Sequence, residues 1–187
     1  MNSKISETNL TTKKSKLLLD KHIAKIPNFP KKGITFYDIS PILESPNLFK
    51  QTIDALCDEA NVFKPDLICG IDARGFLFAT PLAYNLNCGV IMIRKSNKLP
   101  GKVLVQSYEL EYGSSELSIQ TERQLSGKRI LVIDDLIATG GTLNASQALI
   151  KKASGIICGA LCIIELTELK GREKLMCPVV SLQTYRF

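Results

Sequence analysis

The chain has 187 residues, of which 45% are hydrophobic, and a formal net charge of +6. This length and hydrophobic content predict a single globular domain over residues 1–187 and exclude an intrinsically disordered chain. No apolar run is long enough to span a membrane, and one histidine, His22, is too few for a His-based zinc site and leaves no candidate Ser-His-Asp triad.

Charge and cysteine content bear on the partners and the compartment of the protein. The basic residues are spread along the chain without the aromatic interleaving of an RNA-binding module, so we expect no nucleic-acid partner. A basic cleft for a multiply phosphorylated small molecule explains the charge equally well. The six cysteines form no C-x-x-C pair, and the N-terminus is polar, without the apolar core of a signal peptide. These features predict reduced thiols in a reducing compartment and no membrane partner.

The N-terminal region is predicted to be irregular. Residues 1–12 are polar and are expected to form a loose extension. A helix capped by Thr12 or Ser15 is predicted to run to about Lys25. Prolines and a glycine over 27–33 indicate a turn, and residues 34–39 alternate in character, which predicts a short strand or loop.

A strand-turn-helix unit follows a predicted helix over 46–60. The strand is expected over 66–71 and the second helix over 76–86. The turn between them carries Arg74 at the carboxyl end of the strand, where open α/β sheets bind their ligands. A guanidinium suits bidentate binding of an oxyanion; a surface salt bridge is the alternative role.

A third apolar strand over 89–93 leads into a cationic run, RKSNKLPGK, over 94–102. Such runs are usually solvated surface, but at the end of a parallel strand this one also lies where an anion is expected. Residues 103–112 and 115–120 alternate in polarity around Gly113 and Ser114, which predicts a β-hairpin. A hairpin at this edge of the sheet is suited to act as a lid.

The most informative stretch is RILVIDDLIATGGT, residues 129–142. The apolar, β-branched run Ile130–Ile133 is typical of a strand that is buried on both faces. The turn ATGGT over 138–142 leads into a helix predicted over 143–152. Free N–H groups and the helix dipole make such a turn an anion site, and the hydroxyls of Thr139 and Thr142 add donors. The turn is therefore predicted to bind a phosphate; a simple surface turn before a capped helix is the alternative.

Asp134 and Asp135 follow this strand directly. Carboxylates repel a phosphate, so they are expected to bind either the vicinal hydroxyls of a ribose or a divalent metal. The combination predicts a 5-phosphoribosyl ligand, and neither a Walker A sequence nor G-x-G-x-x-G is present. With further strands predicted over 155–166 and 178–182, the fold class is α/β, a twisted, mainly parallel sheet of about five strands flanked by helices.

The stretch 129–142 resembles the phosphoribosyl-diphosphate (PRPP) motif of the type I phosphoribosyltransferases. From about Ile26 onward the chain is similar to the members that act on adenine, through the segments PNFPKKGITFYDISPIL, DARG, RKSNKLPG, SYELEYG and LKGREKL, the last a helix in the family. The resemblance implies that fold with a small N-terminal hood at about 27–45 and a flexible β-hairpin lid at about 95–120. It also implies purine salvage from adenine and PRPP to AMP and pyrophosphate, Mg²⁺ carried mainly by PRPP or pyrophosphate, a homodimer and a cytosolic location.

The resemblance also assigns roles to individual residues. The PRPP- and AMP-binding residues it implies are Asp134, Asp135, Ala138, Thr139, Gly140, Gly141 and Thr142. The pyrophosphate-binding residues are Asp72, Ala73, Arg74, Lys95 and Lys98, with a cis peptide expected between Asp72 and Ala73. The adenine-binding residues are Thr35, Phe36, Tyr37 and Leu136, with Phe36 and Leu136 on opposite faces of the base. Glu111 aligns with the acid/base that exchanges a proton with the purine, and Tyr112 helps to close the lid.

Two positions depart from the family pattern. Tyr37 replaces a frequent Arg and Ala73 replaces a usual Ser, so only backbone contacts carry over at these positions. Two alternative functions remain. The same chemistry on a 6-oxopurine is disfavoured by the hood and lid sequences. A PRPP-sensing regulator without catalysis is disfavoured by the short segment before the hood and by the presence of Glu111.

Overall fold

The protein is built around one seven-stranded sheet. The structure, a computed structural model, describes residues 19–110 and 113–186. The strands of the sheet are β3 Leu67–Ile71, β4 Gly89–Lys95, β5 Val103–Leu110, β6 Gly113–Gln120, β7 Arg129–Ile137, β8 Ile156–Leu166 and β9 Val179–Tyr185. They lie in the order β5-β6-β4-β3-β7-β8-β9. The five neighbouring strands β4, β3, β7, β8 and β9 run parallel to one another. This confirms the predicted parallel sheet, and the predicted hairpin β5–β6 extends it antiparallel along β4.

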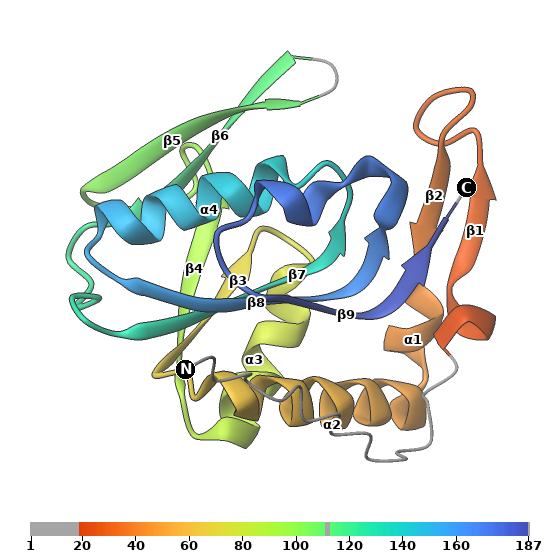
Figure 1. The fold of residues 1–187 in the computed structure, drawn as a ribbon, viewed down its shortest axis with the longest axis horizontal. Helices are drawn as coiled ribbons and strands as arrows, with labels where there is room; N and C mark the ends of the chain where they lie inside the picture. Colours follow the sequence, from red (N-terminus) through yellow and green to blue (C-terminus); the bar gives the residue numbers. More distant parts are fainter. Residues whose placement is uncertain (1–18, 111–112, 187) are drawn as a thin grey trace, which may run out of the picture.

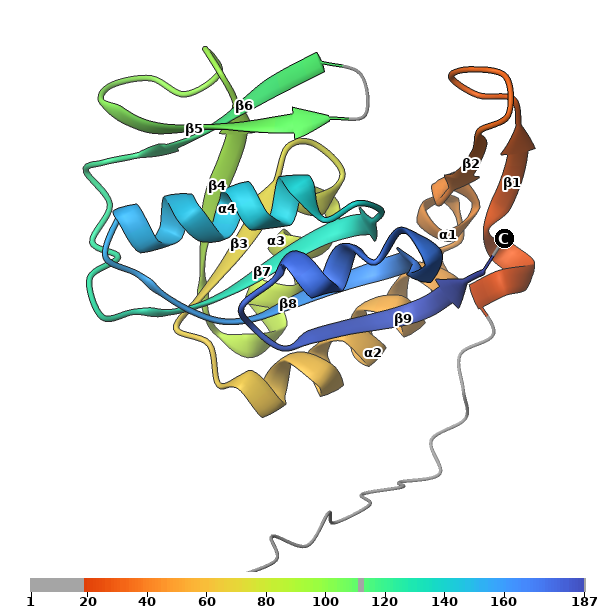
Figure 2. The same cartoon turned by 45° about the horizontal axis from the view of Figure 1, so that its top comes forward.

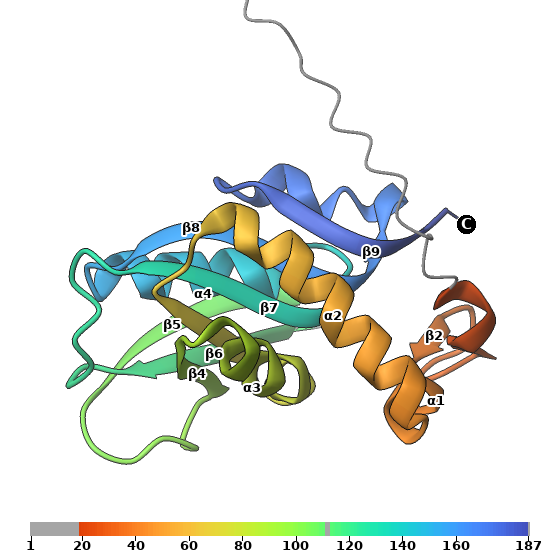
Figure 3. The ribbon, with the colours of Figure 1, turned by 90° about the horizontal axis from the view of Figure 1, so that it is seen from below.

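Helices cover both faces of this sheet (Figure 1). On one face lie α2 Pro46–Phe63 and α3 Gly75–Leu86, and on the other lies α4 Gly141–Lys152. Figure 3, which looks at the molecule from below, shows α2 and α3 in front of the strands. Along β7, Leu131 and Ile133 pack toward α2 and α3, whereas Ile130 and Val132 pack toward α4. This confirms the prediction that the run Ile130–Ile133 is buried on both faces of the sheet.

The N-terminal part forms a separate two-stranded ribbon (Figure 2). β1 Ala24–Pro27 pairs antiparallel with β2 Thr35–Asp38, and α1 Ser40–Glu44 follows. We call residues 24–38 the β1–β2 ribbon. It begins slightly before the segment predicted as a hood, about 27–45, and covers that segment as far as Asp38; α1 lies in the remainder.

The helix predicted to reach about Lys25 is wrong over its described part. Only Leu19–His22 form a short 3-10 helix, and Lys25 lies in β1 opposite Tyr37. Leu19 and Ile23 are buried in the core, and strand pairing with β2 overrides local helix propensity. The predicted extension over 1–12 and the caps Thr12 and Ser15 lie outside the described residues.

Two further boundaries differ from the prediction. β7 continues through the acidic pair to Ile137, because it keeps pairing with β8 as far as Glu165. The segment 168–175, expected as one helix, consists of two 3-10 turns, η2 Thr167–Leu169 and η3 Gly171–Lys174. Lys170 between them has φ 52°, in the left-handed region, which ends the first turn. Within the described ranges, no helix combines the length and hydrophobicity needed to cross a bilayer.

Candidate active site

The predicted site residues gather around one cavity of about 780 Å³ at the carboxyl edge of the sheet. Its walls come from the β1–β2 ribbon, the turn after β3, the end of β4, the hairpin and the stretch from Asp134 to Leu143. The predicted residues that line it are Thr35, Phe36, Tyr37, Asp72, Ala73, Arg74, Lys95, Asp134, Asp135, Leu136, Ala138, Thr139, Gly140, Gly141 and Thr142. Lys98 lies nearby without lining it. Glu111 and Tyr112 lie outside the described residues.

The turn between β7 and α4 presents an uncapped helix N-terminus. Gly140 occupies the position before the helix with φ 76°, which glycine adopts without steric cost. No side chain of the described residues caps the first turn of α4; this turn contains no acidic residue, while Lys151 and Lys152 lie in the last turn. The first N–H groups of the helix are therefore left for a ligand, and the helix dipole favours an anion there.

The acidic pair lies beside this turn with its charges largely buried. Asp135 is 5% exposed, and its backbone N–H donates to Oδ1 of Asp134 at 2.9 Å. Burial, followed by repulsion from Asp135, raises the pKa of Asp134 well above its ordinary value. Burial also raises the pKa of Asp135, against the opposing charge of Arg74. Oδ2 of Asp135 forms an ion pair with Arg74 but accepts no aligned hydrogen bond from the described residues, so a hydroxyl of a ligand can replace Arg74 at this atom.

The start of α3 packs closely against the end of β7, which brings the turn after β3 next to the acidic pair. An added Cβ on Gly75 would lie 2.6 Å from the carbonyl oxygen of Ile133 and 3.3 Å from Oδ1 of Asp134. Only glycine allows the start of α3 to approach the end of β7 this closely. The predicted cis peptide between Asp72 and Ala73 is present immediately before. The residues before α3 and the acidic pair therefore share one rim of the cavity.

Arg74 crosses the cavity from this turn. Its Nε lies 2.8 Å from Oδ2 of Asp135, and its Cζ lies 5.1 Å from the centre of the Phe36 ring. The alternative role of a surface salt bridge does not fit, because the carboxylate partner is buried. Arg74 thus connects the aromatic side of the cavity with the acidic side.

Asp72 holds the cationic run in place. Its carboxylate is buried and accepts from Nε of Arg94 at 3.1 Å, with Nζ of Lys98 at 3.8 Å. Arg94 also donates to the carbonyl of Lys98. Arg94 was not predicted as a site residue, although it is the first residue of the cationic run. Its contacts tie the loop after β4 to the turn after β3, and Lys95 faces the cavity.

The two aromatic residues of β2 have different neighbours. Phe36 packs edge-to-face against Phe29, with ring centres 5.2 Å apart. Tyr37 is 7% exposed and stacks on Tyr185 of β9 at 4.4 Å. Sequence reasoning missed Tyr185, and no local signal could have found it, because the two residues lie at opposite ends of the chain.

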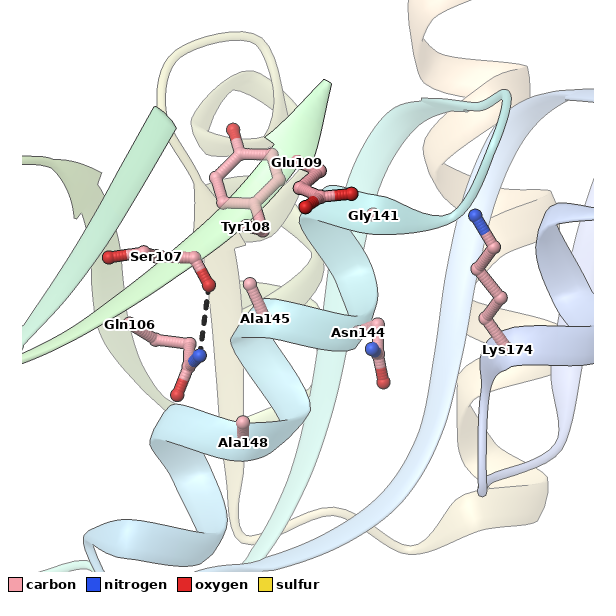
Figure 4. A pocket seen from close by; sticks show the side chains of 9 residues that line it. All are labelled: Gln106, Ser107, Tyr108, Glu109, Gly141, Asn144, Ala145, Ala148 and Lys174. Atoms are coloured by element: carbon pink, nitrogen blue, oxygen red, sulfur yellow. Dashed lines mark hydrogen bonds between the residues drawn. The ribbon is translucent and has the colours of Figure 1, made fainter. Parts of the chain in front are cut away.

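The β5–β6 hairpin lies over the N-terminus of α4 (Figure 4). An added Cβ on Gly141 would lie 3.2 Å from the carbonyl oxygen of Glu109 and 3.4 Å from the Tyr108 ring. A smaller cavity of about 260 Å³ lies between β5 and α4, with Lys174 at its far side. Tyr108 lines both cavities and was not predicted as a site residue, although it lies within the SYELEYG segment. Leu166 and Leu169 also line the main cavity without a sequence signal.

Comparison with known proteins gives one consistent result. A family model described as phosphoribosyl transferase domain matches residues 39–182. A curated adenine phosphoribosyltransferase from Gluconobacter oxydans is 48% identical over 167 residues, which cover 89% of this chain and 93% of the relative. The solved adenine phosphoribosyltransferase of Thermoanaerobacter pseudethanolicus has a TM-score of 0.87 at 43% identity, covering 89% of this chain and 98% of that one. The Saccharomyces cerevisiae enzyme, solved with D-2,5-dideoxy-2,5-imino-altritol 1,6-bisphosphate and adenine, has a TM-score of 0.85 at 39% identity, covering 88% and 96%.

These matches confirm the predicted fold, the type I phosphoribosyltransferase fold, over most of the chain. The chain belongs to the adenine phosphoribosyltransferase family.

Proposed function

We propose that this protein transfers the 5-phosphoribosyl group of PRPP to adenine, giving AMP and pyrophosphate in purine salvage. The observation that carries the proposal is the meeting of four features in one cavity: an uncapped helix turn, a buried acidic pair, a cationic turn and an aromatic ribbon. The relative from Saccharomyces cerevisiae, solved with adenine and a bisphosphate, supports the choice of substrates.

The ribose 5-phosphate is held by the stretch from Asp134 to Thr142. The 5′-phosphate accepts hydrogen bonds from the N–H groups and hydroxyls of residues 138–142, remote from the bond that breaks. The ribose hydroxyls donate to Asp134 and Asp135. The ion pair of Arg74 with Oδ2 of Asp135 supports this assignment, because that oxygen becomes available when Arg74 turns to the leaving group. The carboxylates also favour the positive charge that develops on the sugar ring.

The pyrophosphate leaves toward the cationic turn. Arg74, Lys95 and Lys98 neutralise its charge, together with the backbone of Ala73. Asp72 contributes through its backbone and by holding Lys98 nearby, since its own carboxylate repels an anion. To reach the pyrophosphate, Arg74 must exchange Asp135 for the leaving group.

Magnesium enters with the substrate in this proposal. Among the described residues, no three His, Cys, Asp or Glu side chains are grouped as a metal site. A pair of adjacent carboxylates such as Asp134 and Asp135 suits an ion that is held mainly by phosphate oxygens of the substrate. When bound, Mg²⁺ neutralises charge on the pyrophosphate.

The base lies against the β1–β2 ribbon, which acts as the hood. Phe36 and Leu136 line the same cavity and stack on opposite faces of adenine, while Thr35 and Tyr37 contribute backbone contacts. N9 of adenine attacks the anomeric carbon as the bond to pyrophosphate breaks, through an oxocarbenium-like state. Glu111 accepts the proton that the imidazole ring loses, and the β5–β6 hairpin with Tyr112 closes as a lid that keeps water from PRPP.

A homodimer in the cytoplasm completes the proposal. Four apolar side chains of α3 and β4 are more than 40% exposed, which supports a second copy on this face: Leu77, Tyr84, Val90 and Met92. All six cysteines, which are within the described residues, are free, in keeping with a reducing compartment. Analytical ultracentrifugation of the wild type and of Tyr84→Lys tests the dimer, since a monomeric wild type contradicts it. Microscopy of the fluorescently tagged protein in its own cells tests the location.

The reaction is tested by incubating the protein with PRPP, Mg²⁺ and adenine, hypoxanthine or guanine, and separating the nucleotides by chromatography. AMP from adenine alone is expected. Formation of IMP or GMP instead would show that the substrate is a 6-oxopurine and not adenine. PRPP binding measured by calorimetry without any nucleotide product would indicate the regulator. Omission of Mg²⁺ with added chelator is expected to abolish turnover.

A further inference from the structure

The phosphate-binding turn rests directly on a segment that the proposed function leaves without a role. This segment is η3, which follows β8. Gly140 of the turn and Gly171 of η3 pack backbone against backbone. An added Cβ on Gly140 would collide with the carbonyl group of Gly171, and one on Gly171 would collide with the carbonyl oxygen of Ala138 and lie 2.8 Å from the amide nitrogen of Gly140. The position of Gly171 therefore decides where residues 138–140 can lie.

Gly171 is in turn held by the residue that follows it. Nε of Arg172 donates to Oε1 of Glu165 at 2.6 Å, and its Nη2 donates to Oε2. The hydroxyl of Ser181 on β9 donates to the same Oε2 at 2.7 Å. Glu165 is 2% exposed and lies opposite Ile137, the last residue of β7. Because the planar guanidinium donates from two nitrogens to the two oxygens of one carboxylate, this pair fixes the orientation of Arg172 relative to Glu165.

The other end of this segment is anchored to α4. The backbone N–H of Met176 donates to Oε1 of Gln147 at 3.0 Å, and Gln147 is 8% exposed. Residues 171–176 are thus connected to β8 and, through α4, to the helix whose N-terminus faces the cavity. The segment forms a backing behind the turn, on the side away from the ligand.

We propose that Glu165 and Arg172 are positioning residues for the 5′-phosphate of PRPP. Their ion pair fixes Gly171 as a rigid backing, which holds the N–H groups of residues 138–142 in the geometry that the phosphate requires. Neither Glu165 nor Arg172 lines the main cavity, so both act through the turn and not on the substrate. The inference rests on the proposed function, since it needs a phosphate in that turn.

The test compares Arg172→Lys and Glu165→Gln with the wild type in two assays. Steady-state kinetics gives separate KM values for PRPP and adenine, and calorimetry measures binding of ribose 5-phosphate. Arg172→Lys keeps the positive charge but cannot donate from two fixed nitrogens to both oxygens of Glu165. We therefore expect KM for PRPP and Kd for ribose 5-phosphate to rise about tenfold. KM for adenine is expected to stay within about twofold, because the base pocket is built by other elements.

Two controls separate positioning from general stability. Glu173→Gln changes an exposed charge on η3 next to the pair and is expected to leave both KM values unchanged. Ile53→Val removes one buried methyl group from α2 and is expected to lower Tm, although Ile53 does not belong to the turn over 138–142. If Arg172→Lys lowers Tm but leaves KM for PRPP unchanged, or raises both KM values equally, the pair is only structural.

A milder variant guards against loss of folding. Ser181→Ala removes one donor from Glu165 and is expected to raise KM for PRPP about two- to threefold in a folded protein; no change there would also contradict the inference. A wild type that binds no ribose 5-phosphate and forms no AMP refutes the proposed function itself. A working wild type with unaffected variants refutes the positioning role alone.

Discussion

The Nε atom of Arg74 lies 2.8 Å from the Oδ2 atom of Asp135, so the cation assigned to the leaving group begins in contact with the carboxylate assigned to the ribose. This contact neutralises part of the acidic pair before substrate binds. Arg74 lowers the pKa of both carboxylates, against the burial that raises them. Loss of Arg74 must therefore affect both the leaving group and the protonation of the pair.

Arg74→Gln is expected to lower kcat/KM for PRPP about a hundredfold, because one charged donor to the pyrophosphate is lost. The acidic limb of the pH profile of kcat/KM should also move to higher pH, since the pKa of the pair rises when the cation is removed. Initial rates across a pH series give both results. Arg123→Gln, at an exposed arginine after β6, is the control, and an unmoved acidic limb would contradict the electrostatic role of Arg74.

Asp134→Asn is expected to stabilise the protein at neutral pH while abolishing turnover. The pKa of Asp134 is raised in the folded state, so between the ordinary value of 3.8 and the folded value the folded protein binds more protons than the unfolded chain. Stability then falls as pH rises through this window, and the penalty is fully present above it. Removing the charge should raise the free energy of unfolding by on the order of 1 kcal/mol at pH 7.5. Urea denaturation at pH 7.5 and pH 4 measures it, and the gain should shrink at the lower pH; an equal gain at both would refute burial of the charge as its cause.

Gly140→Ala is expected to destabilise the protein by more than about 2 kcal/mol and to remove PRPP binding, because a Cβ collides with the backbone of Gly171. Gly33→Ala is a matched control. Gly33 also has a positive φ, 88°, but an added Cβ there would have no atom of the described residues within 4 Å. It should lose only about 1 kcal/mol from backbone strain. Thermal unfolding of both variants checks this, and equal losses would show that φ alone, and not the contact with Gly171, matters.

Tyr185→Leu removes the ring on which Tyr37 stacks and is expected to raise KM for adenine several-fold with little change in KM for PRPP. The stack connects the β1–β2 ribbon to β9, so its loss frees Thr35 and Phe36, which the proposed function assigns to the base, from their position in the cavity. Such aromatic pairs contribute about 1 kcal/mol beyond burial. Tyr185→Phe keeps the ring and serves as the control. Equal effects on both KM values in steady-state assays would argue against a specific role in the base pocket.

Glu111→Gln is expected to lower kcat by about 10² to 10⁴, because the amide cannot accept the purine proton. Its neighbour in the same segment, Glu109→Gln, is the control and should keep most of the activity. Stopped assays with saturating adenine and PRPP compare the two variants. Unchanged turnover in Glu111→Gln would leave the acid/base role to another group.

The central sheet was predictable because its signals are local. The apolar run Ile130–Ile133 and the following turn specify a buried strand and a helix start without reference to the rest of the chain. The contacts that complete the site are not local. Arg74 pairs with Asp135 and Tyr37 stacks on Tyr185 across long sequence separations, and neither pairing has a periodic signature. The errors have the same origin: the helix expected before Lys25 gave way to strand pairing, and the helix expected over 168–175 is divided at Lys170, where η3 packs on the turn.

The stack of Tyr37 on Tyr185 also has a consequence for synthesis of the protein. The β1–β2 ribbon is made early, but its aromatic partner belongs to β9, the last strand of the sheet to be translated. A nascent chain that has emerged only as far as β8 lacks the ring of Tyr185 on which the ribbon docks, and it also lacks Gly171, on which the turn at Gly140 packs. Both the ribbon and the support of the phosphate turn are therefore completed only when the C-terminal segment has been made.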